Sequence, residues 1–135
     1  MSYQTIMPLT TVTATGNSDA MHARPRGQNW AYLLRTTATA TDGTDFVAII
    51  IEGQLEVGGA WIDLARFNIV AGDTATRTSA LYVVSNSYEG EVFVSTGIGA
   101  GGTVRPLIPV MIRTSYTVTE GNAASFTFTT GIVSG

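Results

Sequence analysis

The segment FVAIIIEGQL, residues 46–55, decides the fold class of this chain. Its apolar run over 47–51 is rich in β-branched side chains, which lose rotamer freedom in a helix and fit a pleated strand well. The run is also continuous, whereas a strand with one face in water normally alternates apolar and polar residues. We therefore predict a strand over 46–55 that is covered on both faces.

Further strands are predicted on either side of this segment, each bounded by Gly, Asn, Asp or Pro. They span residues 10–15, 30–41, 61–70, 81–84, 92–96, 110–118 and 125–130, and residues 61, 63, 65 and 67 are expected on one side of their strand. No window shows the apolar spacing of an amphipathic helix. The sequence predicts an all-β, single-domain antiparallel β-sandwich or jelly roll of about eight strands, with a closed barrel as the alternative.

Composition agrees with a single soluble β-domain. The chain has 135 residues, and roughly one in six is threonine, a residue enriched in strands. Its net charge is −3 and all seven basic residues are arginines, so an electrostatic fit to nucleic-acid phosphates is not expected. Cysteine is absent, which excludes disulfides, thiolate catalysis and cysteine-type zinc sites.

The chain shows no targeting or membrane signal. No stretch approaches ~18 continuous apolar residues, and the start, MSYQTIMPLTT, lacks the basic flank and apolar core of a secretory signal. Residues 1–29 are expected to form an N-terminal arm with a first strand, and residues 30–135 the sandwich body. The polar stretch 17–28 is open to either a short helical turn or an arm.

Candidate catalytic and metal-binding groups are isolated. His22 is the only histidine and has no partner at metal-ligand spacing, and no Gly-x-Ser-x-Gly elbow occurs. The carboxylates of the 42–45 turn, and Glu89 with Glu91, are explained more simply as turn residues. The glycine-rich segment 97–102 is not followed by a helix start, so it is not a phosphate loop. We expect no enzymatic activity, no cofactor and no metal.

Three motifs together suggest a family. The first is a threonine-rich strand, glycine turn and apolar strand over residues 36–43 and 46–52. The second is a glycine followed by Trp61-Ile-Asp-Leu and Phe67. The third is residues 113–119, then Glu120-Gly-Asn-Ala-Ala and Ser125-Phe-Thr-Phe-Thr. Over about residues 30–130, this combination resembles small structural proteins in the virions of tailed bacteriophages.

That family includes β-sandwich head decoration, or cement, proteins, which often assemble as trimers. The resemblance implies a non-enzymatic homotrimer that bridges subunits of the major capsid protein. It would be made in the host cytoplasm and end on the capsid surface of the virion, with no nucleic-acid or membrane partner. The chain departs from the family pattern in residues 1–29 and 107–111, and the arm over about residues 1–27 is expected to bridge capsomers.

Four arginines are candidates for the interface: Arg24, Arg26, Arg105 and Arg113. A guanidinium pairs bidentately with carboxylates and is desolvated more easily than an ammonium group, so arginine is enriched at interfaces. Tyr88, in a predicted turn, is the candidate for an exposed aromatic ring at the same interface.

A carbohydrate- or receptor-binding module of a phage tail is the alternative function. It would use an exposed platform of aromatic side chains chosen from Trp30, Tyr32, Trp61, Tyr82 and Tyr88. For Trp61 and Phe67 a place in the core is the simpler interpretation, because the core of amphipathic strands needs large side chains.

Overall fold

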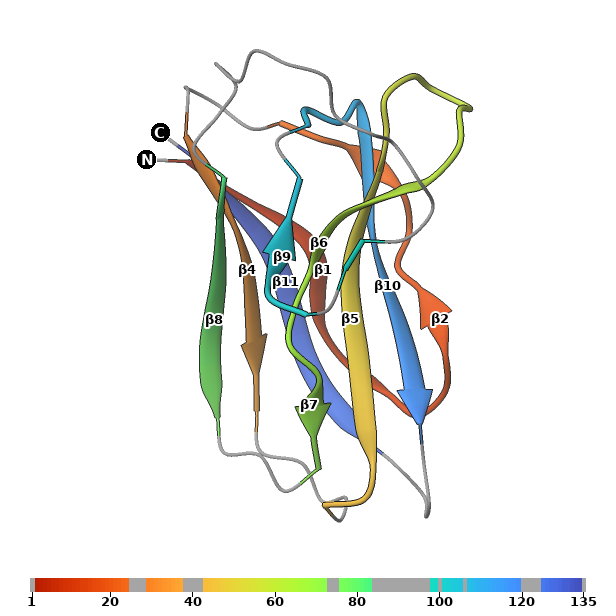
Figure 1. The fold of residues 1–135 in the computed structure, drawn as a ribbon, viewed down its shortest axis with the longest axis vertical. Helices are drawn as coiled ribbons and strands as arrows, with labels where there is room; N and C mark the ends of the chain where they lie inside the picture. Colours follow the sequence, from red (N-terminus) through yellow and green to blue (C-terminus); the bar gives the residue numbers. More distant parts are fainter. Residues whose placement is uncertain are drawn as a thin grey trace.

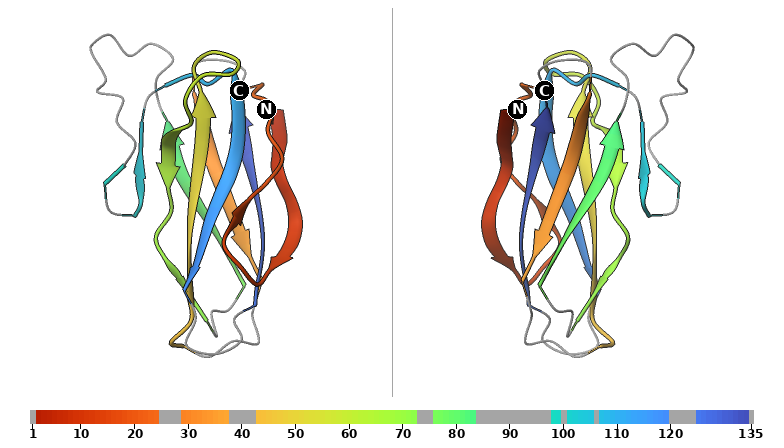
Figure 2. Two further views of the ribbon diagram at one scale, coloured as in Figure 1. Left: turned by 90° about the vertical axis from the view of Figure 1, so that its right-hand side faces the viewer. Right: turned by 90° about the vertical axis from the view of Figure 1, so that its left-hand side faces the viewer.

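The computed structural model describes residues 2–24, 29–37, 43–72, 76–83, 98–99, 101–105, 107–119 and 125–134. Its strands form two antiparallel sheets that pack face to face (Figures 1 and 2). The predicted all-β sandwich is confirmed. The described part of the chain also contains no helix long and apolar enough to cross a membrane.

The first sheet has four strands in the order β1-β11-β4-β8. These are β1 (Ser2–Val12), β11 (Phe126–Ser134), β4 (Trp30–Thr36) and β8 (Arg77–Val83). The second sheet contains β2 (Gly16–Asn17), β10 (Met111–Thr119), β5 (Phe46–Gln54), β6 (Ile62–Arg66) and β9 (Thr103–Val104) in that order, with β3 (Met21–His22) on β10 and β7 (Val70–Ala71) on β5.

The described residues thus form eleven strands, and the expected number of about eight is wrong. Four of the eleven, β2, β3, β7 and β9, are only two residues long. A strand this short shows no alternation, so the hydrophobic pattern cannot reveal it. The strand predicted over 92–96 lies outside the described residues.

Strand β5 lies between β10 and β6 and carries the centre of the core on one face. Val47, Ile49 and Ile51 are completely buried, whereas Ala48 and Ile50 face outward and are partly exposed. Strand β5 is therefore fully buried on its inner face only, and the prediction that both of its faces are covered is wrong. The rest of the core consists of side chains from both sheets, the largest being Trp30, Tyr32, Phe67, Phe126 and Phe128.

Residues 61, 63, 65 and 67 were expected on one side of their strand, but a bulge in β6 places them on two different sides. The pairing of β5 with β6 shifts by one residue, and Leu64 and Ala65 are both completely buried although they are adjacent. A bulge of this kind reverses the facing of every residue beyond it. As a result Phe67 lies in the core, as expected, but Trp61 and Asp63 lie on the outer side and are only half-buried.

The N-terminal residues belong to both sheets. β1 pairs with β11 from Ser2 opposite Ser134 to Val12 opposite Phe126, and β2 and β3 pair with β10. Ile6 and Val12 are buried in the core. Residues 2–24, expected as an arm with a first strand, are therefore paired along the sandwich body, and the two chain ends lie together at one end of it (Figure 1).

Candidate functional site

Three of the five predicted interface residues lie in the described part of the chain. Arg26 and Tyr88 lie outside it. Arg24 is exposed, while Arg105 and Arg113 are half-buried. The three arginines come from different elements, namely the segment after β3, the segment after β9, and β10.

Arg113 is held on the outer face of the second sheet by two contacts within the chain. Its Nε donates to Glu52 Oε2 at 2.7 Å, across the β10–β5 register that places the two residues opposite each other. Its guanidinium carbon lies 4.1 Å from the centroid of the Trp61 ring, a cation–π contact. Arg113 thus already has partners, and it covers the Trp61 ring.

Four large apolar side chains are exposed near one end of the sandwich: Leu55, Val57, Ile108 and Val110 are 44, 69, 51 and 39% exposed. Val110 N donates to Gln54 O at 2.7 Å, which brings the segment before β10 beside the β5–β6 connection. Figure 1 shows both segments at the end where the chain termini lie. We call these four side chains the end patch.

Packing of Pro109 fixes the position of this segment. A Cβ added to Gly53 would lie 2.7 Å from Pro109 Cβ, so Pro109 sits directly on the glycine and is buried. Ala23 N donates to Val110 O at 2.9 Å, so the exposed Arg24 follows directly on a residue bonded to the end patch. Arg105 lies three positions before Ile108 in the same connection.

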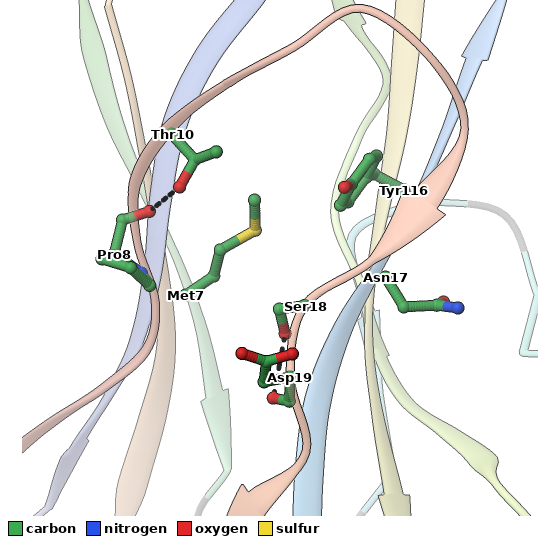
Figure 3. A pocket seen from close by; sticks show the side chains of 7 residues that line it. All are labelled: Met7, Pro8, Thr10, Asn17, Ser18, Asp19 and Tyr116. Carbon is green, nitrogen blue, oxygen red and sulfur yellow. Dashed lines mark hydrogen bonds between the residues drawn. The ribbon is translucent and has the colours of Figure 1, made fainter.

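A shallow groove of about 240 Å³ opens between the edges of the two sheets (Figure 3). Its lining comes from β1 and from the segment that contains β2, with one residue from β10: Met7, Pro8, Thr10, Asn17, Ser18, Asp19 and Tyr116. Pro8 and Thr10 lie on one side, Tyr116 on the other, and Met7 between them. The sequence alone did not identify this groove. The groove forms only because β1 and β2, which are edge strands of different sheets, lie side by side.

Two of the candidates for the aromatic platform of the alternative function lie in the core instead. Trp30 and Tyr32 are 2% and 0% exposed and belong to the core. Burial raises the pKa of Tyr32 to about 12, with the Trp30 side chain acting in the opposite direction. Neither the Trp30 Nε1 nor the Tyr32 hydroxyl has a partner at hydrogen-bond geometry among the described residues, so desolvation dominates. Tyr88 and the side chain of Tyr82 lie outside the described part.

The remaining candidates for chemistry stay separate. His22 is exposed, and its backbone carbonyl accepts a bond from Gln4 Nε2 at 2.7 Å. Asp45 is buried, while Asp42, Glu89 and Glu91 lie outside the described residues. Within the described ranges, no group of three or more His, Cys, Asp or Glu side chains could hold a metal ion.

Comparison of the chain with protein-family models, curated proteins and solved structures gives no match. The surfaces of this chain are therefore the basis for inferring its function.

Proposed function

We propose that this protein is a non-enzymatic decoration, or cement, protein of a tailed-phage capsid and attaches to the shell through the end patch. The end patch is the observation that supports this function. Single exposed apolar residues are ordinary, but a group of them bordered by polar residues commonly marks a protein-binding surface. Arg24 and Arg105 near the patch suit the arginine-rich composition of interfaces.

The end patch, rather than an N-terminal arm, is the proposed point of attachment. Backbone groups of β1 are used in pairing with β11, and its side chains Ile6, Met7 and Val12 are buried. An arm that bridges to a neighbouring subunit must leave its own body, and β1 leaves only if the core is opened. The segment over 107–110, where the chain departs from the family pattern, exposes apolar groups while the core stays closed.

We further propose that the protein acts as a homotrimer. The outward-facing residues of β5, Phe46, Ala48 and Ile50, form a partly exposed apolar row that we call the outer row. Contact between copies through the outer row would complete the cover that the sequence of β5 suggests. A trimer presents three end patches to the major capsid protein at once, so modest individual contacts combine into lasting attachment.

The first test is the mass of the protein in solution, by light scattering behind a sizing column. A species near three times 14.2 kDa is expected, and substitution Ile50→Asp on the outer row should reduce it to a monomer. A wild-type protein that is monomeric at all concentrations contradicts the trimer.

The second test is co-sedimentation with assembled shells of the major capsid protein from the same virion. The double variant Val57→Ser/Ile108→Ser should lose attachment while keeping its fold, because both side chains are exposed. Ile69→Ser is the matched control: Ile69 is 49% exposed and immediately precedes β7, which pairs with the opposite end of β5. Equal attachment of the double variant and the control would exclude the end patch as the shell contact.

A further inference from the structure

Strand β1, at the edge of the first sheet, lies beside the β2 edge of the second sheet, and we call the line between them the seam. The seam is bridged by hydrogen bonds at both ends and is open in the middle. At one end Gln4 of β1 bonds across the seam, its Nε2 donating to His22 O at 2.7 Å and its Oε1 accepting from Arg24 N at 2.8 Å. At the other end the connection after β1 is tied to β10, where Val118 N donates to Thr15 Oγ1 at 3.0 Å. The groove of Figure 3 lies between these ties.

Strand β1 is deformed where it borders the groove. The β1–β11 register shifts between Thr5 and Met7 and again between Met7 and Thr10. Consecutive residues Ile6 and Met7 are consequently both buried, at 1% and 4% exposure, and Met7 is turned to the floor of the groove. Bulges redirect side chains and occur preferentially at sheet edges and beside functional sites.

The lining combines apolar surface with polar groups that have no other use. The apolar part consists of Met7, Pro8 and the ring of Tyr116, which is fixed by an edge contact with Phe128 at 5.9 Å between centroids. In the described part of the chain, the Tyr116 hydroxyl and the Asp19 carboxylate form no hydrogen bond, so a phenol and a carboxylate are available together, whereas the Asn17 side chain points away from the groove (Figure 3).

The two aliphatic hydroxyl groups of the lining, those of Ser18 and Thr10, are already engaged. Ser18 Oγ accepts from Thr114 N at 2.8 Å and approaches Asp19 O at 3.5 Å. Thr10 Oγ1 donates to Pro8 O at 2.7 Å. These bonds hold both walls of the groove in place and leave the Tyr116 hydroxyl and the Asp19 carboxylate to contact a ligand.

We propose that this groove binds one neutral pyranose ring of a glycan. A pyranose has an apolar C–H face, which suits the Tyr116 ring and the Met7 and Pro8 side chains, and hydroxyls that both donate and accept. Asp19 accepts hydrogen bonds, whereas the Tyr116 hydroxyl can donate as well as accept. This site is independent of the end patch, so it is a second binding function whether or not the protein decorates a capsid.

The volume of the groove and the charge of its lining restrict the class of ligand that it can bind. Sites for drug-sized ligands measure about 300–1,000 Å³, so a groove of about 240 Å³ holds a single ring. The only charged side chain in the lining is Asp19, which disfavours sulfated or carboxylated sugars. A simple cation would use acceptors alone and leave the hydroxyl donor of Tyr116 without a role.

The experiment is a titration of ¹⁵N-labelled full-length protein followed by amide chemical shifts. The probes are the methyl glycosides of glucose, galactose and mannose, each raised to about 50 mM, because a few hydrogen bonds in a shallow site give an affinity in the millimolar range. Saturable shifts confined to residues of the groove are expected with at least one probe.

Tyr116→Phe and Asp19→Ala should each weaken that binding about tenfold, the effect of one lost hydrogen bond of this kind. Asp19 is exposed and Tyr116→Phe removes only the hydroxyl, so both variants should fold, and an unchanged spectrum elsewhere verifies it. Glu56→Ala is the matched control, since it removes an exposed carboxylate from the β5–β6 connection. Methylammonium chloride serves as the cation probe.

Three results would overturn the proposal. They are the absence of saturable shifts with all three glycosides, binding that both variants retain at full strength, and shifts at the groove with methylammonium alone. The last result would reassign the groove to a cationic group. Loss of capsid attachment in the end-patch variant bears on none of these outcomes, so the two functions can fail separately.

Discussion

The hydroxyl oxygens of Thr114 and Thr130 lie 2.7 Å apart in the interior, where either can donate to the other. Thr114 belongs to β10 of the second sheet and Thr130 to β11 of the first, so this bond joins the two layers across the core. Both residues are at most 1% exposed. In these surroundings each hydroxyl depends on the other, because a buried hydroxyl without a partner is costly.

Replacing either threonine with valine should therefore destabilise the protein more than replacing both. Thr114→Val or Thr130→Val leaves one buried hydroxyl without a partner, and we expect a loss of about 1–3 kcal/mol in the free energy of unfolding. The double variant removes both polar groups and should lose less than the sum of the single variants. Urea unfolding of the four proteins gives the coupling energy. Additive losses would show that the two hydroxyls do not depend on each other.

Arg113 should contribute to stability more than an exposed arginine does. It makes an ion pair with Glu52 and a cation–π contact with Trp61, and the side chains of the ion pair are 23% and 15% exposed. Allowing for solvent screening, we expect Arg113→Ala to cost about 1–2 kcal/mol. Arg35→Ala on the exposed side of β4 should change stability by less than about 0.5 kcal/mol.

Arg113→Lys separates the two contacts. Lysine keeps the charge but has neither the planar group that stacks on Trp61 nor the Nε–H that bonds Glu52. We expect Arg113→Lys to recover less than half of the stability that Arg113→Ala loses. Thermal unfolding at low and high salt measures this difference. Full recovery by lysine would mean that charge alone matters at this position.

The sequence predicted the sheet character of the chain because β5 contains a continuous apolar run rich in β-branched residues, and because β10 and β11 are long enough to show period-two alternation. Phe126 and Phe128, which alternate with threonine in β11, are both buried in the core. The shortest strands and the bulge at Leu64 could not be predicted, because their positions depend on register with a partner strand. The same holds for Trp61, whose outward facing follows from that bulge.

The candidate site was less predictable than the fold. Arg113 was chosen from its residue type, yet its partner Glu52 is 61 positions away and only the β10–β5 register brings the two together. The groove joins Met7 to Tyr116, which are even farther apart in the sequence. A weak signal was present in Pro8 within an otherwise strand-like segment, since proline is confined to strand edges and bulges.

Two glycines in the sheets should respond differently to alanine. At Gly53 an added Cβ would lie 2.5 Å from Leu64 Cδ1 and 2.7 Å from Pro109 Cβ, both held by packing, so Gly53→Ala should cost about 1–3 kcal/mol. At Gly131 the obstacle is the Tyr3 ring, 2.6 Å away at its hydroxyl. Tyr3 is 56% exposed and can turn into solvent, so Gly131→Ala should cost less than about 1 kcal/mol.

Denaturant unfolding of both glycine variants checks this order. A loss at Gly131 as large as that at Gly53 would mean that the Tyr3 ring is held in place over β11. In that case the double variant Tyr3→Ala/Gly131→Ala should recover the lost stability, because it removes the side chain that the added methyl group displaces.

Stability should fall at alkaline pH because of Tyr32. Its pKa is raised by burial to about 12 in the folded protein, from 10.0. The unfolded chain therefore ionises first, so the contribution is complete below about pH 10 and is lost as the pH rises through 12. Two pKa units correspond to about 3 kcal/mol. Tyr32→Phe should remove this part of the pH dependence.

The comparison requires urea unfolding of the wild type and Tyr32→Phe between about pH 9 and pH 12. At neutral pH the variant should be at least as stable as the wild type, since it removes a buried hydroxyl without a hydrogen-bond partner among the described residues. Parallel pH profiles for the two proteins would show that Tyr32 ionises at the same pH in the folded and unfolded chains.

Removal of residues 1–12 should abolish cooperative folding rather than release a dispensable arm. The deletion takes Ile6, Met7 and Val12 out of the core and leaves β11 with an unpaired edge. Each buried side chain of this size is worth about 2–5 kcal/mol, so together they are comparable with the whole stability of a typical domain. Near-ultraviolet circular dichroism and thermal unfolding of the truncated protein should show no native signal.

Leu9→Ser is the control for this deletion, because Leu9 is on the same strand but 60% exposed, and the variant should unfold like the wild type. A truncated protein with a native spectrum and a cooperative transition would show that β1 is an accessory strand that can leave the body. Only then would an N-terminal arm be available to bridge capsomers, and attachment by the end patch would have to be tested again in the truncated protein.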